Sequence, residues 1–175
     1  PRPTATASTS LPAPPPAPLA TYVGPARRPG VPLAASSGTS QNAVLKEYVA
    51  RGTYIFPPKA ALRLVTDTFA YCVDNLPKWN FINVSGYHIR EAGSDAVQEL
   101  AFPMANAVAY IRAGIDAGID IDRLGPRFAF FLVCQNHPSD EVAKVRAARR
   151  TWAHLVRDHF NANDPTPCLL TSHPP

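Results

Sequence analysis

The stretch that decides the fold is Phe81-Ile82-Asn83-Val84-Ser85-Gly86-Tyr87-His88-Ile89-Arg90-Glu91-Ala92-Gly93. Its first part, residues 81–85, is mostly apolar and predicts a short buried strand before Gly86. Aromatic, imidazole, guanidinium and carboxylate side chains follow at once, and Ser94 and Asp95 then predict the start of a helix. In parallel α/β folds, ligands bind at the carboxyl ends of the strands. We therefore expect a ligand site directly after this strand.

The flanking sequence repeats this alternation of strand and helix. Residues 60–76 carry apolar side chains at helical spacing, and residues 128–133 are apolar on both faces, as a buried parallel strand requires. Leu169-Leu170 suggest one further strand. The helix after Asp95 is expected to bury Val97, Leu100, Ala101, Met104, Val108, Ile111 and Ile115. The helix after Ser139 is expected to bury Val142, Val145, Trp152, Leu155 and Val156.

Repeated strand–helix units place the chain in the α/β class, with a parallel sheet and helical crossovers. Periodicity alone leaves two architectures open, half of an eight-stranded barrel or a small open sheet. The 175 residues are enough for one domain. Ten of the 20 prolines fall in the first 32 residues, which hold few large apolar side chains. We therefore predict that residues 1–29 form a disordered tail and that residues 30–175 form the folded domain.

The charge distribution argues against a nucleic-acid-binding body. Residues 1–40 hold three of the 17 basic residues and no acid, so the remainder balances 14 basic residues against all 13 acids. No apolar run approaches the roughly 20 residues of a membrane span. The cysteines Cys72, Cys134 and Cys168 are widely spaced and odd in number. Their pattern predicts reduced, packed thiols in a cytoplasmic setting, with no metal site.

Three residues are candidates for chemistry. His88, between Gly86 and Gly93, could donate a hydrogen bond or move a proton near neutral pH, although a histidine that merely caps the turn would give the same pattern. Arg51 could clamp a carboxylate, or it could interact with the dipole at the end of a helix. Arg127 opens a buried strand, where it needs an anionic partner, and a structural ion pair is the alternative.

A series of short blocks carries the remaining signal. They are Ser37-Gly38-Thr39-Ser40-Gln41-Asn42, Leu45-Lys46-Glu47-Tyr48, Arg51-Gly52-Thr53-Tyr54-Ile55-Phe56-Pro57-Pro58, Ser85-Gly86-Tyr87-His88, Glu91-Ala92-Gly93, Gln98-Glu99-Leu100-Ala101-Phe102, Pro126-Arg127, Ala143-Lys144 and Arg146-Ala147-Ala148-Arg149-Arg150. In this order and spacing the blocks resemble the adenosylcobalamin-dependent acyl-CoA mutases, from about residue 30 to residue 173. No Asp-x-His-x-x-Gly pattern occurs in the chain. The cobalt's lower ligand would therefore come from elsewhere.

The resemblance implies a (β/α)8 TIM barrel, of which this chain would supply about strands four to seven. The substrate would lie along the barrel axis, with adenosylcobalamin at one end. The implied reaction is a radical rearrangement of an acyl-CoA, and the favoured one is the conversion of methylmalonyl-CoA to succinyl-CoA. The alternatives are ethylmalonyl-CoA or isobutyryl-CoA as the substrate, and an inactive remnant or a subunit-pairing fragment as the role. A partial barrel leaves strand edges open, so we expect no activity from the chain alone.

The resemblance also implies partners and residue roles. The partners would be an acyl-CoA and a cobalamin-binding domain or small subunit, in a heterodimer or a homodimer. His88 would hydrogen-bond the thioester carbonyl, and Tyr87 would lie beside the adenosyl group. The substrate contacts would come from Thr39, Gln41, Arg51, His88 and Arg127, and the positions beside the corrin would be Ala50, Arg51 and Glu91. Arg51 would pair with the free carboxylate of methylmalonyl-CoA. A buried arginine without an anion is costly, which favours a dicarboxylic substrate.

Overall fold

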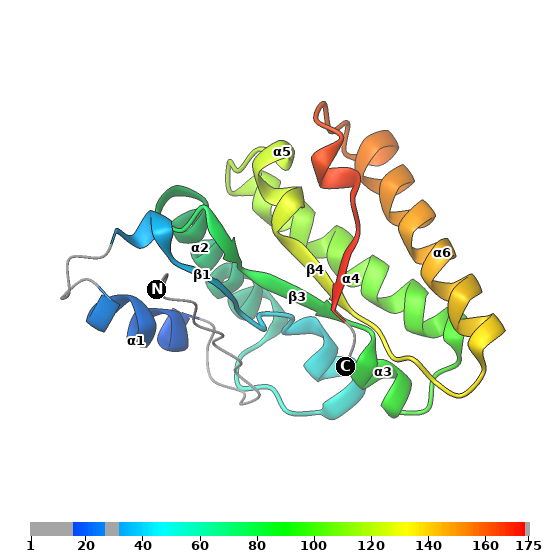
Figure 1. Cartoon of the computed structure of the whole chain (residues 1–175). Helices are drawn as coiled ribbons and strands as arrows, with labels where there is room; N and C mark the ends of the chain where they lie inside the picture. The colour runs from blue at the N-terminus through cyan, green and yellow to red at the C-terminus, as the bar shows by residue number, and fades with distance from the viewer. Residues whose placement is uncertain (1–15, 27–31, 174–175) are drawn as a thin grey trace.

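Each pair of neighbouring strands in the described part of the chain is parallel. A computed structural model describes residues 16–26 and 32–173 (Figure 1). The strands are β1 (Ser37–Thr39), β2 (Lys78–Asn80), β3 (Ile82–Ser85), β4 (Phe128–Phe131) and β5 (Thr171–His173). β1 pairs with β2, and a three-stranded sheet has the order β3-β4-β5. Only Phe81 separates β2 from β3. The parallel sheets confirm the predicted α/β class.

Helices connect these strands. They are α1 (Pro16–Ala26), α2 (Pro58–Asn75), α3 (Tyr87–Glu91), α4 (Ala96–Asp116), α5 (Ile121–Leu124) and α6 (Pro138–His154). Short 3-10 turns span Leu33–Ala35, Gly125–Arg127 and Thr166–Cys168, and π-helices span Glu47–Arg51 (η2) and Leu155–His159 (η4). Figure 1 shows α2, α4 and α6 side by side along one face of the strands, with α4 packed against both of the others.

The start and the end of α4 follow the sequence closely. Asp95 caps the helix, because its side chain accepts a hydrogen bond from the Gln98 amide at 2.8 Å. The Gln98 side chain in turn accepts from the Asp95 amide at 3.1 Å, which completes a capping box. Gly118, just beyond the helix, has a φ of +86°, a conformation that glycine adopts without strain. The predicted start at Ser94-Asp95 is therefore confirmed.

Aromatic side chains join the sheet to the helices. Phe69 of α2 lies 4.4 Å from the ring of Phe81 and 6.1 Å from that of Phe128, measured between centroids. Trp152 of α6 packs on Phe130 at 4.9 Å. Successive side chains of a strand point to opposite faces. Since Phe128 and Phe130 face the helices, the alternate residues of β3 and β4 face the other way, namely Asn83, Ser85, Ala129 and Phe131.

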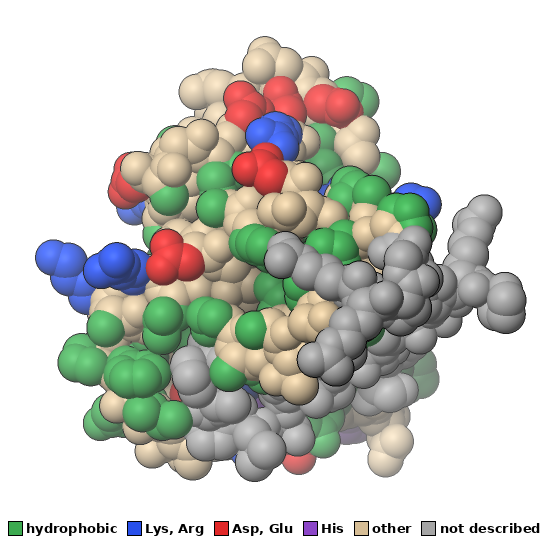
Figure 2. All heavy atoms as spheres, turned by 90° about the vertical axis from the view of Figure 1, so that its left-hand side faces the viewer, with side chains coloured by type: hydrophobic (Ala, Val, Ile, Leu, Met, Phe, Trp, Pro, Cys, Tyr) green, Lys and Arg blue, Asp and Glu red, His purple; other side chains and the backbone are tan. Residues whose placement is uncertain are grey.

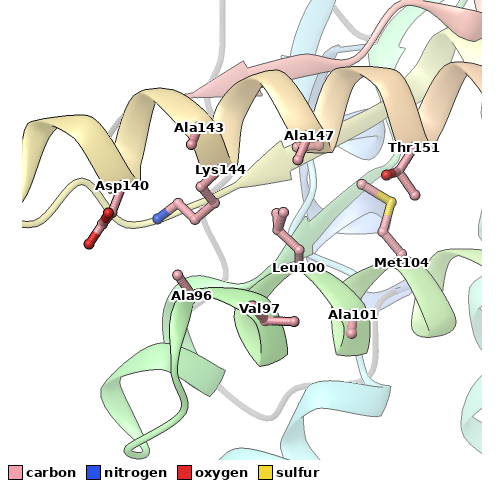
Figure 3. Close-up of a pocket in the computed structure, with 11 residues that line it drawn as sticks. Ala96, Val97, Leu100, Ala101, Met104, Asp140, Ala143, Lys144, Ala147 and Thr151 are labelled. Carbon is pink, nitrogen blue, oxygen red and sulfur yellow. The ribbon is translucent and has the colours of Figure 1, made fainter.

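The predicted buried faces of α4 and α6 are wrong in part. Val97 is 75% exposed and Val142 is 59% exposed, whereas Glu99 and Lys144 are buried. Both helices are thus turned so that a charged side chain of each points inward. A groove of about 600 Å³ lies between the two helices, and five of its eleven lining residues are alanines (Figure 3).

The prediction of a disordered tail is wrong for residues 16–26, which form α1. Leu19 and Val23 are buried in the main core, and the ring of Tyr22 lies 5.0 Å from that of Trp79. Apolar residues at positions i, i+3 and i+4 give this proline-rich segment one face that can pack. Residues 1–15 and 27–29 of the predicted tail lie outside the described residues. Figure 2 views the molecule from the side of α1 and shows apolar side chains spread over it.

The thiols differ from one another in burial. Cys72 is buried, Cys168 is half-buried and Cys134 is exposed, and all three are free. The expectation of packed thiols is therefore wrong for Cys134, which follows β4 in a loop. Within the described ranges, no helix is long and apolar enough to cross a bilayer.

Leu19→Ala tests whether α1 belongs to the folded core. Removing a buried leucine side chain should lower the free energy of unfolding by about 2–3 kcal/mol. Ala20→Ser, on the exposed side of the same helix, should change it by less than about 0.5 kcal/mol. Urea unfolding of the 175-residue chain measures both. Equal, small effects would mean that α1 does not pack on the core.

Candidate active site

The carboxyl ends of three strands meet at one edge of the molecule. The helix η2 follows β1, α3 follows β3 directly, and the loop 132–137 follows β4. The helices α3 and η2 contact each other, so segments some 40 residues apart in the chain meet at this edge. Of the predicted site residues, Thr39 ends β1 and Gln41 follows it, while Tyr87 and His88 open α3.

His88 is held on two sides. Its Nδ1 lies 2.7 Å from the hydroxyl oxygen of Ser85, the last residue of β3. Its ring also meets the ring of Tyr87 edge to face, at 5.4 Å between centroids. Tyr87 in turn stacks on Phe131, the last residue of β4, at 5.0 Å. The two adjacent strand ends thereby fix both aromatic rings of α3.

Burial keeps the imidazole of His88 uncharged at neutral pH. Desolvation by burial, joined by the nearby positive charges of Lys46 and Arg51, lowers the pKa of His88 to about 4. The carboxylate of Glu47 acts in the opposite direction and is the weakest of these influences. A neutral imidazole carries one N–H donor and one acceptor nitrogen. His88 is therefore suited to hydrogen bonding and not to acting as a cation.

A charged cluster on η2 surrounds this histidine. Lys46 and Glu47 form an ion pair, and Glu47 also accepts a hydrogen bond from the hydroxyl of Thr53 at 2.7 Å. Arg51 Nε lies 3.7 Å from Glu47 Oε2, and the Arg51 side chain is 39% exposed. The premise that Arg51 is buried, on which the preference for a dicarboxylic substrate rested, is therefore wrong. Arg51 has an anionic neighbour and remains open to solvent.

The other predicted site residues lie at different depths. Ala50 is half-buried in η2, and Glu91 is exposed at the end of α3. Arg127 precedes β4 and so lies at the amino end of that strand, away from His88. It lies near Cys72, and burial lowers the pKa of Arg127 and raises that of Cys72 to about 12. Arg127 thus does not share the edge where the other residues gather.

The sequence reasoning missed a buried ion pair next to the site, that of Glu99 with Lys144. Glu99 accepts hydrogen bonds from the Val133 amide and from Lys144 Nζ, each at 2.8 Å. Both residues stand within the blocks quoted above, but the helical pattern assigned them no role. The signal that could have found them is a single acid and a single lysine on helix faces that are otherwise apolar. In the part of the chain that the structure describes, no group of three or more His, Cys, Asp or Glu side chains could hold a metal.

The fold and this edge define a class, an α/β protein with a candidate ligand site at the carboxyl ends of parallel strands. A family model described as Methylmalonyl-CoA mutase matches residues 3–174, and the chain therefore belongs to the methylmalonyl-CoA mutase family. The match begins well before residue 30, so similarity to the family extends into the predicted tail.

Named relatives agree with this family. The chain is 43% identical to "Methylmalonyl-CoA mutase, mitochondrial" of Mus musculus and 45% identical to "Methylmalonyl-CoA mutase large subunit" of Streptomyces virginiae. Each match covers 155 residues, 89% of this chain and 21% of the relative. The chain thus spans about a fifth of the length of the curated relatives it matches. Since one of these relatives is named mitochondrial, the cytoplasmic setting stays a prediction.

The titration of His88 tests the electrostatics of this edge. Its NMR signals should titrate with a midpoint near 4 instead of at the ordinary 6.5. Because the folded pKa is the lower one, the stability that neutral His88 contributes is complete above pH 6.5 and is lost as the pH falls toward 4. Arg51→Gln should raise the midpoint, whereas Arg63→Gln, on the exposed face of α2, should not. A midpoint near 6.5 in the intact chain would contradict the burial of His88.

Proposed function

We propose that this chain is part of the catalytic barrel of an isomerase that converts methylmalonyl-CoA to succinyl-CoA with the help of adenosylcobalamin. The observation that carries the proposal is a neutral, hydrogen-bonded His88 at the carboxyl end of β3, in a chain of this family. The barrel, the cofactor, the substrate and the residue roles are all part of the proposal. The chain alone is expected to be inactive, because it spans about a fifth of its relatives.

The face of the sheet that points away from the helices supports a substrate channel. Asn83, Ser85, Ala129 and Phe131 lie on it, and the first three are polar or small. Asn83 Oδ1 is buried and has no hydrogen-bond partner in the described part of the chain. Such an orphan acceptor costs free energy unless a ligand donates to it. An amide N–H of an extended CoA arm could do so. Arg127 at the amino end and His88 at the carboxyl end would then contact opposite ends of the same substrate.

In this proposal His88 acts as a fixed hydrogen-bond donor. The Ser85 hydroxyl can donate to Nδ1 of the ring, which leaves the proton on Nε2. That N–H would point at the thioester carbonyl oxygen, which gains partial negative charge during the rearrangement. A donor that is already in place stabilises such charge more in the transition state than in the ground state. Because the ring is neutral, it polarises the carbonyl without transferring its proton.

The edge beyond η2 fits a large, flat cofactor. When bound, adenosylcobalamin supplies the radical that starts the rearrangement. Val49, Tyr54 and Ile55 are more than half exposed, and they lie on either side of Arg51. An exposed apolar patch of this kind marks a surface that a ligand or another protein covers. The proposed corrin neighbours Ala50, Arg51 and Glu91 lie along the same edge. The cobalamin-binding domain or small subunit would close over it, within a heterodimer or a homodimer.

His88→Ala in the complete enzyme tests the proposed donor. The kcat on methylmalonyl-CoA should fall by about 10²–10³, the effect of losing one oxyanion-type donor. The KM should change far less, because the CoA portion is bound elsewhere. His154→Ala, an exposed histidine at the end of α6, provides the matched control and should leave kcat unchanged. A His88→Ala enzyme that melts normally and keeps its kcat would exclude His88 from the chemistry.

Arg51→Gln tests the proposed substrate preference. A charge-assisted hydrogen bond to the free carboxylate contributes about 1.5–3 kcal/mol, so kcat/KM for methylmalonyl-CoA should fall by about 10- to 100-fold. The value for isobutyryl-CoA, which lacks that carboxylate, should fall much less. The two substrates are compared on the same enzyme preparation, with Arg63→Gln as the control for loss of charge. Equal losses on both substrates would assign Arg51 a structural role through Glu47.

A further inference from the structure

Glu99 is the centre of a buried polar cluster that no proposed role has used so far. Its side chain has no exposed surface. Oε1 accepts a hydrogen bond from the Val133 amide, and Oε2 accepts one from Lys144 Nζ, both at 2.8 Å. Lys144 Nζ also donates to the carbonyl oxygen of Val133 at 2.7 Å and pairs with Glu141. One ion pair thus satisfies both backbone polar groups of Val133, where the strand β4 has already ended.

The same glutamate supports the turn that carries His88. A Cβ atom placed on Gly86 would lie 2.9 Å from the backbone oxygen of Glu99 and 3.1 Å from its Cγ. No side chain fits in this space, so the turn rests directly on the first turn of α4. The Gly86 amide donates to the carbonyl oxygen of Phe131 at 2.8 Å, the last bond between β3 and β4. His88 follows two residues later.

A third contact joins Glu99 to α3 itself. Arg90 Nε lies 3.9 Å from Glu99 Oε2. The other nitrogens of the Arg90 guanidinium donate to the Ser94 carbonyl at 2.9 Å and to Gln135 Oε1 at 3.2 Å. Gln135 belongs to the loop after β4, as Val133 does. Arg90 therefore bridges the segment of His88 and the loop of Val133, with Glu99 beneath both.

We propose that Glu99 and Lys144 are positioning residues of the active site. They fix the backbone after β3 and after β4, and through it the rings of His88 and Tyr87, the latter stacked on Phe131. An ion pair that serves stability alone can often be replaced by apolar residues at little cost. This pair binds the backbone of a site loop, which apolar side chains cannot do. The inference rests on the proposed function for its kinetic consequences but on the contacts alone for its structural ones.

The test compares three variants of the complete enzyme. Glu99→Gln keeps the shape and removes the charge. The variant Glu99→Gln with Lys144→Met and Glu141→Gln removes all three charges of the cluster, so it leaves no lone buried charge, and it serves if the single variant does not fold. Asp74→Asn is the control, since it breaks the exposed ion pair of Asp74 with Arg123, whose atoms lie 2.7 Å apart. Kinetics on methylmalonyl-CoA, thermal melts and amide hydrogen exchange are measured for each.

Misplacing a site by about an ångström costs up to about 10²-fold in rate. We expect both Glu99 variants to lower kcat by about 10- to 100-fold while KM changes little. The kinetics are measured well below the melting temperature of each variant. Amide exchange should accelerate at least about tenfold in residues 86–91 and 132–135 and not in α2. The Asp74→Asn enzyme should match the unaltered one. A folded Glu99 variant with normal kcat would overturn the proposal.

Combining Glu99→Gln with His88→Ala shows whether Glu99 acts by positioning His88 or by a general effect on the enzyme. If Glu99 acts through His88, adding Glu99→Gln to His88→Ala should lower kcat far less than it does alone. If the double variant instead loses kcat by the product of the two single fold-decreases, the proposed coupling is overturned. If His88→Ala itself leaves kcat unchanged, the proposed function fails. The exchange of residues 86–91 and 132–135 then decides whether Glu99 holds the two segments, and unchanged exchange rules that out.

Discussion

A carboxylate and an ammonium group that are both removed from water must lie against each other, because an isolated buried charge costs several kcal/mol. In this chain the requirement falls on Glu99 of α4 and Lys144 of α6, whose charged atoms lie 2.8 Å apart with almost no exposed surface. Meeting it sets the rotation of both helices about their axes. Val97 and Val142 are turned outward as a consequence, and the groove of Figure 3 opens between the helices. The pair also binds the backbone of Val133, just beyond the end of β4, so it connects helix packing to the edge where the site lies.

The two faces of the sheet serve different purposes. The ion pair lies at the end of the sheet, just after β4. Toward the helices, aromatic rings such as Phe69, Phe128 and Trp152 supply large buried areas that stabilise the layers. Away from the helices, Asn83 and Ser85 offer polar groups that a core would not tolerate without partners. The strands are therefore anchored by one face, while the other carries polar and small side chains that are buried in this chain. On this face the Ser85 hydroxyl lies 2.7 Å from His88 Nδ1, and Phe131 stacks on Tyr87.

The strands β3 and β4 and the helices α2 and α4 could be predicted because their signals are local, namely apolar runs, helical spacing and the Asp95 cap. The buried faces of the helices could not be predicted in this way. A helical pattern expects Val97 to be buried in preference to Glu99, and only the distant Lys144 makes burial of the Glu99 carboxylate acceptable. The folding of α1 was missed for a related reason. Proline density outweighed Leu19 and Val23, which belong to a core that also contains residues of α2 and later elements. His88 was found from its place after a strand, whereas the exposure of Arg51 depends on Glu47 and on the path of η2.

The charges around His88 also bear on what a dicarboxylic substrate would do to it. Lys46 and Arg51 lower the pKa of His88, and Glu47 raises it. Under the proposed function, a substrate carboxylate that pairs with Arg51 would add negative charge near the ring and would act as Glu47 does. Burial, however, is the largest cause of the low pKa, and a bound substrate removes still more water from the ring. The two effects oppose each other, so His88 would stay neutral in the complex. A neutral donor stabilises charge on the thioester oxygen without transferring a proton to it, which is the behaviour that a rearrangement without net proton transfer requires.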